Sequence, residues 1–396
     1  MQYTLRTKCM GLMFGGLVLL LSGCSPTAST SSPAPQSQQI GESWQYGQQA
    51  IWRDTMAAIE YVGDEHYNVA AWYLTTYNLV TGEKRRLLEV PADRIFQQPS
   101  IYQDKIVWAA ANRFEAIMQS STTVNYDIMN WDIFLYNLTT GETQQITTDT
   151  HAQLQPQIYE DNIVWLDNRN AQTDVYPPGL DIYAYNLITK QERRLTSAPT
   201  VDDYDPLSIN GNNVVWADMR HADPQVKNHA GNDVKYNNEI YLYDLATNQE
   251  RRITANVAFN DHYPCIDGST IVWLRQIDYR QANVYAYDLA SSTGKEIQIS
   301  KSNYAAGYPS VSSGKIVWQD ARTSRGNTMN DVIENGQAGA SDIYLYDLHA
   351  AKETKLTAED AQGHKLWAAP VICGNYILYM LDRQIGPVIY ALSLPK

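Results

Sequence analysis

Seven copies of one pattern occupy almost the whole chain. Each copy contains Ile-Val-Trp or a close variant, and a Tyr-x-Leu sequence follows it. The first anchor falls at Trp52, Trp108, Trp165, Trp216, Trp273, Trp318 and Tyr379, and the second at Tyr77, Tyr136, Tyr185, Tyr243, Tyr287, Tyr346 and Tyr390. Successive first anchors lie between 45 and 61 residues apart, so the copies differ mainly by insertions. Such a period is typical of repeat proteins, in which each unit buries its core against its neighbours.

The pattern of each copy predicts four short strands. In the third copy we expect strands at 156–160, 162–167, 181–187 and 192–196, joined by turns typical of hairpins. From the second copy onward a proline lies shortly before the first anchor, at Pro99, Pro156, Pro206, Pro264, Pro309 and Pro370. We expect this proline to begin the first strand, where its missing N–H group is tolerated.

The third strand of each copy is apolar or aromatic on both faces. In the sixth copy Ile343 and Leu345 point one way, while Tyr344 and Tyr346 point the other. A strand in a half-exposed sheet would alternate apolar with polar residues instead. Sheets covered on both faces and repeated around a ring predict an all-β chain, a seven-bladed β-propeller with four-stranded antiparallel blades. A linear stack would need capping repeats, which the sequence lacks.

The two ends of the repeat region complement each other. The last copy stops after its third strand, at 388–396, and has nothing left to form a fourth. Residues 36–44 resemble a fourth strand that has no copy of its own. We therefore expect this N-terminal strand to complete the seventh blade and to close the ring.

The consensus Ile-Val-Trp-x-Asp-x-Arg, followed by Asp-Ile-Tyr-Leu-Tyr-Asp-Leu, resembles the TolB-like β-propeller repeat of bacterial and archaeal envelope proteins. The resemblance covers residues 37–396. It implies a propeller, but it leaves the function open because one fold hosts many activities. TolB proper has an additional α/β domain without a counterpart here, and propeller peptidases carry a Gly-x-Ser-x-Gly motif that this sequence lacks.

The first residues indicate an exported lipoprotein. Two basic residues precede a short apolar run, and Leu-Ser-Gly-Cys ends at Cys24 and resembles a bacterial lipobox. We expect a signal peptide at 1–23, a lipidated Cys24 with a flexible tether over 24–36, and the propeller over 37–396. The protein would then be anchored to the cell membrane or the outer membrane. The alternative is an ordinary cleaved signal with an incidental cysteine.

The formal charge of −13 argues against nucleic acid as a partner, because phosphate binding needs a basic surface. Removal of Arg6 and Lys8 with the leader would make the chain still more acidic. Cys265 and Cys373 lie in copies that are not neighbours, so we expect two free thiols, although an exported protein could join them. We expect a monomer.

Candidate binding residues gather at one predicted end of the propeller. We call this end the loop face; it holds the connections from the second to the third strand and from the fourth strand to the next copy. These connections vary strongly in length, and binding residues favour such loops. The candidates are Tyr204, Tyr263, Tyr308 and Trp367, with His151, His262 and His364. The tyrosines could instead pack between blades. The three histidines could hold a metal, but they lie in separate copies, so we predict no metal and no cofactor.

A second recurrent group consists of acid–arginine pairs. They are Asp167 with Arg169, Asp218 with Arg220, and Asp320 with Arg322. We interpret them as structural clasps, in which the arginine grips the acid that begins the third strand. Contact with a ligand is the alternative.

These features predict a membrane-anchored lipoprotein whose propeller binds a protein or an envelope polymer, a peptide or a glycan, on its loop face. We expect it to be non-catalytic. The alternative is an exported carbohydrate-active enzyme, a polysaccharide lyase or a glycosidase, with its site at the same face.

Overall fold

The computed structural model describes fifteen stretches of the chain, all within the compact unit Ala34–Lys396. They are 36–42, 44–63, 69–90, 94–112, 130–171, 179–196, 205–221, 237–256, 259–278, 281–292, 294–303, 305–322, 342–357, 365–383 and 386–395. The regular structure in these stretches is β-strand. Among these residues, no helix has the length and apolar character needed to cross a membrane.

The strands form seven antiparallel sheets of four strands each, which we call blades 1 to 7. Blade 1 contains β2 (Trp44–Trp52), β3 (Thr55–Gly63), β4 (Val69–Asn78) and β5 (Lys84–Val90). Blade 2 contains β6 (Arg94–Tyr102), β7 (Lys105–Asn112), β8 (Trp131–Asn137) and β9 (Thr143–Gln145). Blade 3 contains β10 (Gln153–Tyr159), β11 (Asn162–Asp167), β12 (Asp181–Asn186) and β13 (Gln191–Arg194).

The later blades follow the same order. Blade 4 contains β14 (Ser208–Asn210), β15 (Asn213–Asp218), β16 (Glu239–Asp244) and β17 (Gln249–Arg252). Blade 5 contains β18 (Asn260–Asp267), β19 (Thr270–Gln276), β20 (Ala282–Asp288) and β21 (Glu296–Gln298). Blade 6 contains β22 (Ala306–Ser312), β23 (Lys315–Asp320), β24 (Asp342–Asp347) and β25 (Lys352–Lys355). Blade 7 contains β26 (Lys365–Cys373), β27 (Tyr376–Arg383), β28 (Gly386–Ser393) and β1 (Gln36–Glu42).

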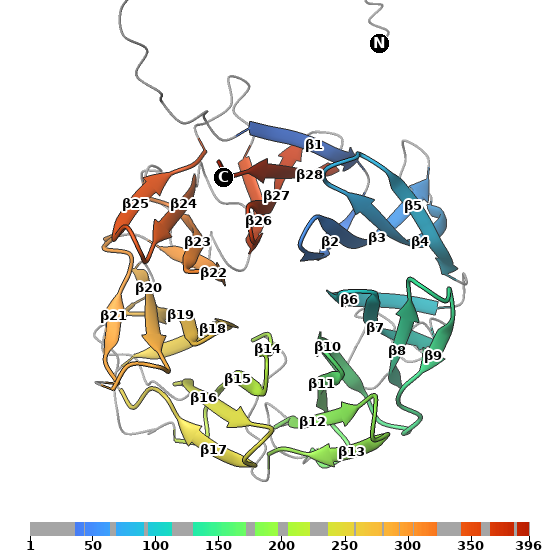
Figure 1. Ribbon diagram of the computed structural model, residues 1–396, viewed down its shortest axis with the longest axis horizontal. Helices are drawn as coiled ribbons and strands as arrows, with labels where there is room; N and C mark the ends of the chain where they lie inside the picture. The colour runs from blue at the N-terminus through green and yellow to red at the C-terminus, as the bar shows by residue number, and fades with distance from the viewer. Residues whose placement is uncertain are drawn as a thin grey trace, which may run out of the picture. The chain divides into compact units, whose positions relative to one another are not determined.

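The blades stand around a central axis, with the first strand of each blade innermost (Figure 1). The predicted seven-bladed propeller is therefore confirmed. The second strand of each blade is buried on both faces, as in β11, where all residues after Asn162 are buried. The anchor tryptophans of the later blades are the largest side chains of this core, and Trp165, Trp216, Trp273 and Trp318 are fully buried. The alignment of Trp52 as the first anchor is wrong, because Trp52 ends the innermost strand β2 and Ala58 of β3 takes the anchor position in blade 1.

The ring closes as the sequence predicts. β1, the first strand of the chain, pairs antiparallel with β28, the last, from Gln36 opposite Ser393 to Glu42 opposite Val388 (Figure 1). Ile40 of β1 is buried in a cluster that includes Met380 and Ile389 of the same blade and also Met56 of blade 1. The N-terminal strand thus supplies both a hydrogen-bonded ladder and part of the contact between blades 7 and 1.

The position of the prolines differs from the prediction. Five of them lie inside the innermost strands β6, β10, β18, β22 and β26, at Pro99, Pro156, Pro264, Pro309 and Pro370. Each lies where the pairing with the next strand shifts register. Such a β-bulge leaves residues unpaired, so a proline there costs no ladder hydrogen bond. Only Pro206 precedes its strand, because β14 begins at Ser208.

Deletion of Gln36–Gly41 should lower the free energy of unfolding by about 3 to 5 kcal/mol, because a strand ladder and the buried Ile40 are lost. Urea unfolding followed by tryptophan fluorescence measures this change. Deletion of six residues just upstream, Ser29–Ala34, is the control and should leave the unfolding midpoint unchanged. Equal midpoints for both deletions would contradict the role of β1 in closing the ring.

Candidate functional site

A buried carboxylate organises the recurrent acid–arginine pair of blade 3. The Asp167 side chain is fully buried and accepts a hydrogen bond from Nε1 of Trp165 at 2.9 Å. Arg169 donates to the same carboxylate from its backbone N–H at 2.9 Å, from Nε at 2.9 Å and from a terminal nitrogen at 2.6 Å. These bonds satisfy the buried charge, so Asp167 is held by the two motif residues on either side of it.

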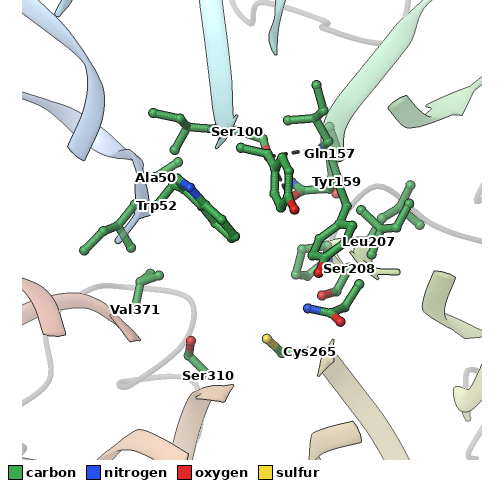
Figure 2. Close-up of a pocket in the computed structure, with 18 of the residues that line it drawn as sticks. Ala50, Trp52, Ser100, Gln157, Tyr159, Leu207, Ser208, Cys265, Ser310 and Val371 are labelled. Carbon is green, nitrogen blue, oxygen red and sulfur yellow. Dashed lines mark hydrogen bonds between the residues drawn. The ribbon is translucent and has the colours of Figure 1, made fainter. Parts of the chain in front are cut away.

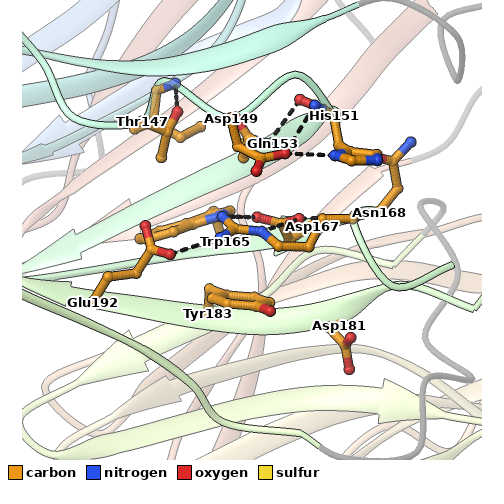
Figure 3. A network of polar contacts seen from close by, with 12 residues as sticks. Thr147, Asp149, His151, Gln153, Trp165, Asp167, Asn168, Asp181, Tyr183 and Glu192 are labelled. Atoms are coloured by element: carbon orange, nitrogen blue, oxygen red, sulfur yellow. Dashed lines mark hydrogen bonds and ion pairs between the residues drawn. The ribbon is translucent and has the colours of Figure 1, made fainter.

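The arginine then connects three strands of the blade. Its guanidinium lies over the ring of Tyr183 on β12, 4.2 Å from the ring centre, and donates to Glu192 on β13 at 2.8 Å (Figure 3). Blades 4 and 6 repeat the arrangement. Arg220 joins Asp218, Tyr241 and Glu250, and Arg322 joins Asp320, Tyr344 and Glu353. Burial of each of these arginines lowers its pKa, but the neighbouring carboxylates outweigh this effect and raise the pKa overall.

Our prediction of the acid that pairs with the arginine is wrong. The acid that begins the third strand pairs instead with a cation at the end of the fourth strand. Asp181 pairs with Arg194 at 2.8 Å, Glu239 with Arg252 at 2.7 Å, and Asp342 with Lys355 at 2.7 Å. Arg169 cannot take this role because it folds back by two residues onto Asp167 and over the tyrosine ring. Two separate ion pairs therefore pin each of these three blades at its loop-face end.

Two of the predicted binding residues, His262 and Tyr263, contact a second buried carboxylate, Asp205. Their expected position in a connecting loop is wrong, because both lie within strand β18, as Tyr308 lies within β22. The Asp205 side chain is only 3% exposed and lies 3.1 Å from Nδ1 of His262. It accepts hydrogen bonds from the amide of Asn238 at 3.2 Å and from the backbone N–H of Tyr263 at 3.1 Å. Asp205 thereby fixes the His262 ring and the backbone of Tyr263, both on β18, at the contact between blades 4 and 5.

Tyr263 and Tyr308 form an aromatic pair across blades 5 and 6. Their ring centres are 5.1 Å apart, and both residues have a left-handed backbone with φ of 50°. Each precedes the proline of its bulge, so the bulge turns both side chains away from the normal pleat. Burial raises the pKa of the Tyr308 hydroxyl to about 12, which keeps it neutral and able to donate a hydrogen bond.

The other predicted residues do not join this group within the described structure. His151 lies beside the blade 3 clasp, where its Nδ1 is 2.6 Å from Asp149 and its side chain is half exposed (Figure 3). Trp367 is part of β26, but its side chain lies outside the described residues, as do Tyr204 and His364. Among the described residues, no three metal-binding side chains come together. Cys265 and Cys373 are free thiols.

A cavity of about 460 Å³ lies at the centre of the ring (Figure 2). Its wall runs along the innermost strands of all seven blades, from Tyr263 and Tyr308 at the bulges to Trp52 and Tyr159 at the ends of β2 and β10. The lining residues are apolar, aromatic, amide or hydroxyl-bearing, with the single thiol of Cys265, and none carries a formal charge. Burial raises the pKa of that thiol, so it too stays neutral.

Serine hydroxyls connect the innermost strands around this cavity. Ser100, Ser208 and Ser310 each accept a hydrogen bond from a backbone N–H of the following blade, at 3.1 to 3.3 Å. Figure 2 shows all three at the wall. The blades are therefore joined at the cavity by direct hydrogen bonds, which holds the lining side chains in fixed positions.

Sequence reasoning missed the aromatic residues at the opposite end of the cavity. Trp52, Tyr102 and Tyr159 end the innermost strands of blades 1, 2 and 3, with ring centres 4.2 and 4.5 Å apart in succession. The available signal was an aromatic residue at the same place in three consecutive copies, Ile-Trp, Ile-Tyr and Ile-Tyr. It was overlooked because the short turns at this end were not expected to take part in a concave site.

No protein-family model and no curated protein sequence matches this chain. Among solved structures it is similar to the β-propeller domain of the Trilobed protease from Pyrococcus furiosus, with a TM-score of 0.58 and 12% identity over 92% of this chain and 94% of that one. That propeller is described as having an open velcro topology, whereas β1 and β28 pair here.

Acylaminoacyl peptidase from Pyrococcus horikoshii gives a TM-score of 0.56 and 12% identity over 87% of this chain. The chain spans half the length of that peptidase. TolB from Acinetobacter baumannii gives a TM-score of 0.39 and 15% identity over 86% of this chain and 80% of TolB, a likeness too low to carry an argument. The two peptidase structures show that the chain shares the propeller fold.

Replacement of Asp167 by Asn should lower the free energy of unfolding by about 2 to 4 kcal/mol, because Arg169 and Trp165 lose a buried, charged acceptor. The matched control is Asp161→Asn, whose carboxylate is 40% exposed and 3.9 Å from Lys105, and which should cost less than about 1 kcal/mol. Chemical unfolding of both variants measures the difference. Similar losses in the two would show that Asp167 is not the centre of the clasp.

Proposed function

We propose that this chain is an exported, lipid-anchored protein of the TolB-like propeller type, and that it binds a protein or an envelope polymer without catalysis. The binding site that we propose is the central cavity, entered from the loop face past His262, Tyr263 and Tyr308. The cell envelope, with the cell membrane or the outer membrane as the anchoring surface, is the proposed location. Cys24 would carry the lipid.

The observation that carries this proposal is the rigid aromatic pair at the edge of the cavity. Tyr263 and Tyr308 are in contact, and the Asp205 carboxylate holds the backbone of Tyr263. The left-handed backbone also occurs at Gln155 in the bulge of blade 3, so it belongs to the repeat, and the pair of aromatic rings is what distinguishes blades 5 and 6. Two tyrosines in contact at a cavity support a role in binding, since tyrosine supplies a large contact area with a polar tip.

The chemistry of the lining supports binding more than turnover. The residues that line the cavity in the described part of the chain include no carboxylate, imidazole or amine. Acid–base catalysis on a sugar chain requires groups that can take up and release a proton near neutral pH.

The carbohydrate-active alternative rests on one observation, the contact of His262 with Asp205 at 3.1 Å. A carboxylate that orients an imidazole is a pairing found in general-base catalysis. Formation of new reducing ends or unsaturated sugars by the purified protein, lost in His262→Ala, would replace the non-catalytic proposal with this one.

Replacement of Cys24 by Ser should move the protein from the membrane fraction to the soluble fraction, because lipid on this residue is the proposed anchor. Fractionation of cells followed by immunoblotting measures the distribution. Cys9→Ser is the control, since Cys9 belongs to the expected signal peptide, and it should remain in the membrane fraction. Retention of Cys24→Ser in membranes after a high-salt wash would contradict the lipid anchor.

Replacement of Tyr308 by Ala should weaken ligand binding about tenfold or more, because a buried aromatic contact at the cavity is lost. Two probes serve here, cell-wall sacculi in co-sedimentation and a short neutral peptide of Gly, Ser and Ala in fluorescence titration. The full chain in detergent is used. Tyr73→Ala is the control, because Tyr73 lies on β4 away from the cavity, under the guanidinium of Arg86.

The melting temperatures of both variants must stay close to that of the parent protein. This control shows that weaker binding does not result from unfolding. Equal binding by the parent and by folded Tyr308→Ala would place the site elsewhere on the propeller.

A further inference from the structure

We propose that the occupant of the central cavity is a neutral saccharide chain, held between the aromatic groups at its two ends. This inference rests on the proposed function, and it narrows the ligand from a peptide or a glycan to an uncharged glycan. Three properties of the cavity support this inference. The described lining residues are uncharged, aromatic and amide side chains lie on the wall, and proline-containing bulges interrupt the innermost strands.

The wall selects against charged ligands. The chain carries a formal charge of −13, yet the described lining residues carry none. Two carboxylates next to the wall already have partners within the protein. Asp267 at the end of β18 accepts from the Asn210 amide at 3.1 Å and from the Ser313 backbone N–H at 2.7 Å. Asp205 accepts from the Asn238 amide and from the backbone N–H of Tyr263. A charged group that entered would lose its hydration without gaining an ionic partner, which is unfavourable. A neutral ligand avoids this cost.

The side chains on the wall match the two surfaces of a sugar ring. Trp52, Tyr102 and Tyr159 form an aromatic arc at one end, and Tyr263 and Tyr308 form a pair at the other. Aromatic faces cover the C–H surface of a sugar, while amides and hydroxyls bond to its hydroxyl groups.

One amide on the wall lacks a partner. The side-chain oxygen of Gln49 is buried and has no hydrogen-bond partner among the described residues. A buried acceptor without a partner is unfavourable, and rotation of the Gln49 side chain toward the cavity would let a ligand hydroxyl group satisfy it.

The strand edges at the cavity are poor templates for a polypeptide. An extended peptide commonly binds by adding a strand to a free sheet edge. The innermost strands present such edges to the centre, but β6, β10, β18, β22 and β26 each contain a proline at a β-bulge. The proline removes a donor and the bulge breaks the regular spacing, so a peptide would find few bonds there. A saccharide needs no such ladder.

The volume of the cavity suits a short saccharide segment. About 460 Å³ falls within the roughly 300 to 1,000 Å³ of ordinary ligand sites. The serine bonds between neighbouring blades fix the wall in advance, which lowers the entropic cost of binding.

The test uses an array of neutral oligosaccharides, including maltotetraose and tetra-N-acetylchitotetraose, with oligogalacturonate as the acidic counterpart and the neutral peptide above. Binding to the full chain in detergent is followed by calorimetry and tryptophan fluorescence. We expect at least one neutral oligosaccharide to bind about tenfold or more tightly than the acidic one. Tyr159→Leu and Gln49→Leu should each weaken that binding about tenfold, while Tyr159→Phe and the distant control Tyr73→Leu should not.

The outcomes separate this inference from the proposed function. Binding of the peptide in the cavity, sensitive to Tyr308→Ala, with no neutral saccharide bound, would overturn the glycan assignment and keep the binding function. Binding of neither saccharide nor peptide nor sacculi would overturn both. Saccharide binding that is unchanged in folded Tyr159→Leu and Gln49→Leu would overturn the cavity as its site.

Discussion

The pairing of β1 with β28 is the interaction on which the ring depends. Seven sheets with apolar faces can bury those faces only if each has a neighbour on both sides, and blade 7 is incomplete without a strand from the other end of the chain. Ile40 shows the link directly, because it packs with residues of both blade 7 and blade 1. The wall of the central cavity takes strands from all seven blades, including the two that this junction joins.

Within each blade, the most regular part of the repeat has a structural purpose. The buried aspartate of blade 3 binds the tryptophan before it and the arginine after it, and that arginine covers a tyrosine and reaches a glutamate on the outermost strand. Blades 4 and 6 contain the same contacts. A feature that occurs at several places around a ring stabilises the ring, and a single binding site needs something that differs between blades.

That difference lies along the innermost strands. The residue that ends this strand is Trp52, Tyr102 and Tyr159 in the first three blades, but Asn210 and Asp267 in the next two. The tyrosine before the proline occurs at Tyr263 and Tyr308, where blade 3 has Gln155 with the same left-handed backbone. One backbone scaffold thus presents an aromatic surface on one side of the cavity and polar groups on another, which is how a symmetric fold obtains an asymmetric site.

The sequence by itself determined the number of blades, the order of their strands and the closure of the ring, because anchors such as Trp165 and Tyr185 recur in register and local strand pairing follows from that register. It predicted His262, Tyr263 and Tyr308 in loops at one end of the propeller, whereas they lie within the innermost strands β18 and β22. Only the tertiary structure decided that Asp205 of blade 4 holds His262 and Tyr263 of blade 5, that Arg169 turns back to Asp167, and that Trp52 and Tyr159 belong to the same cavity as Tyr308. Contacts between blades join residues far apart in the sequence, such as Asp205 and His262, which are 57 positions apart. Their geometry follows from the twist and packing of whole sheets, which no local pattern of side chains specifies.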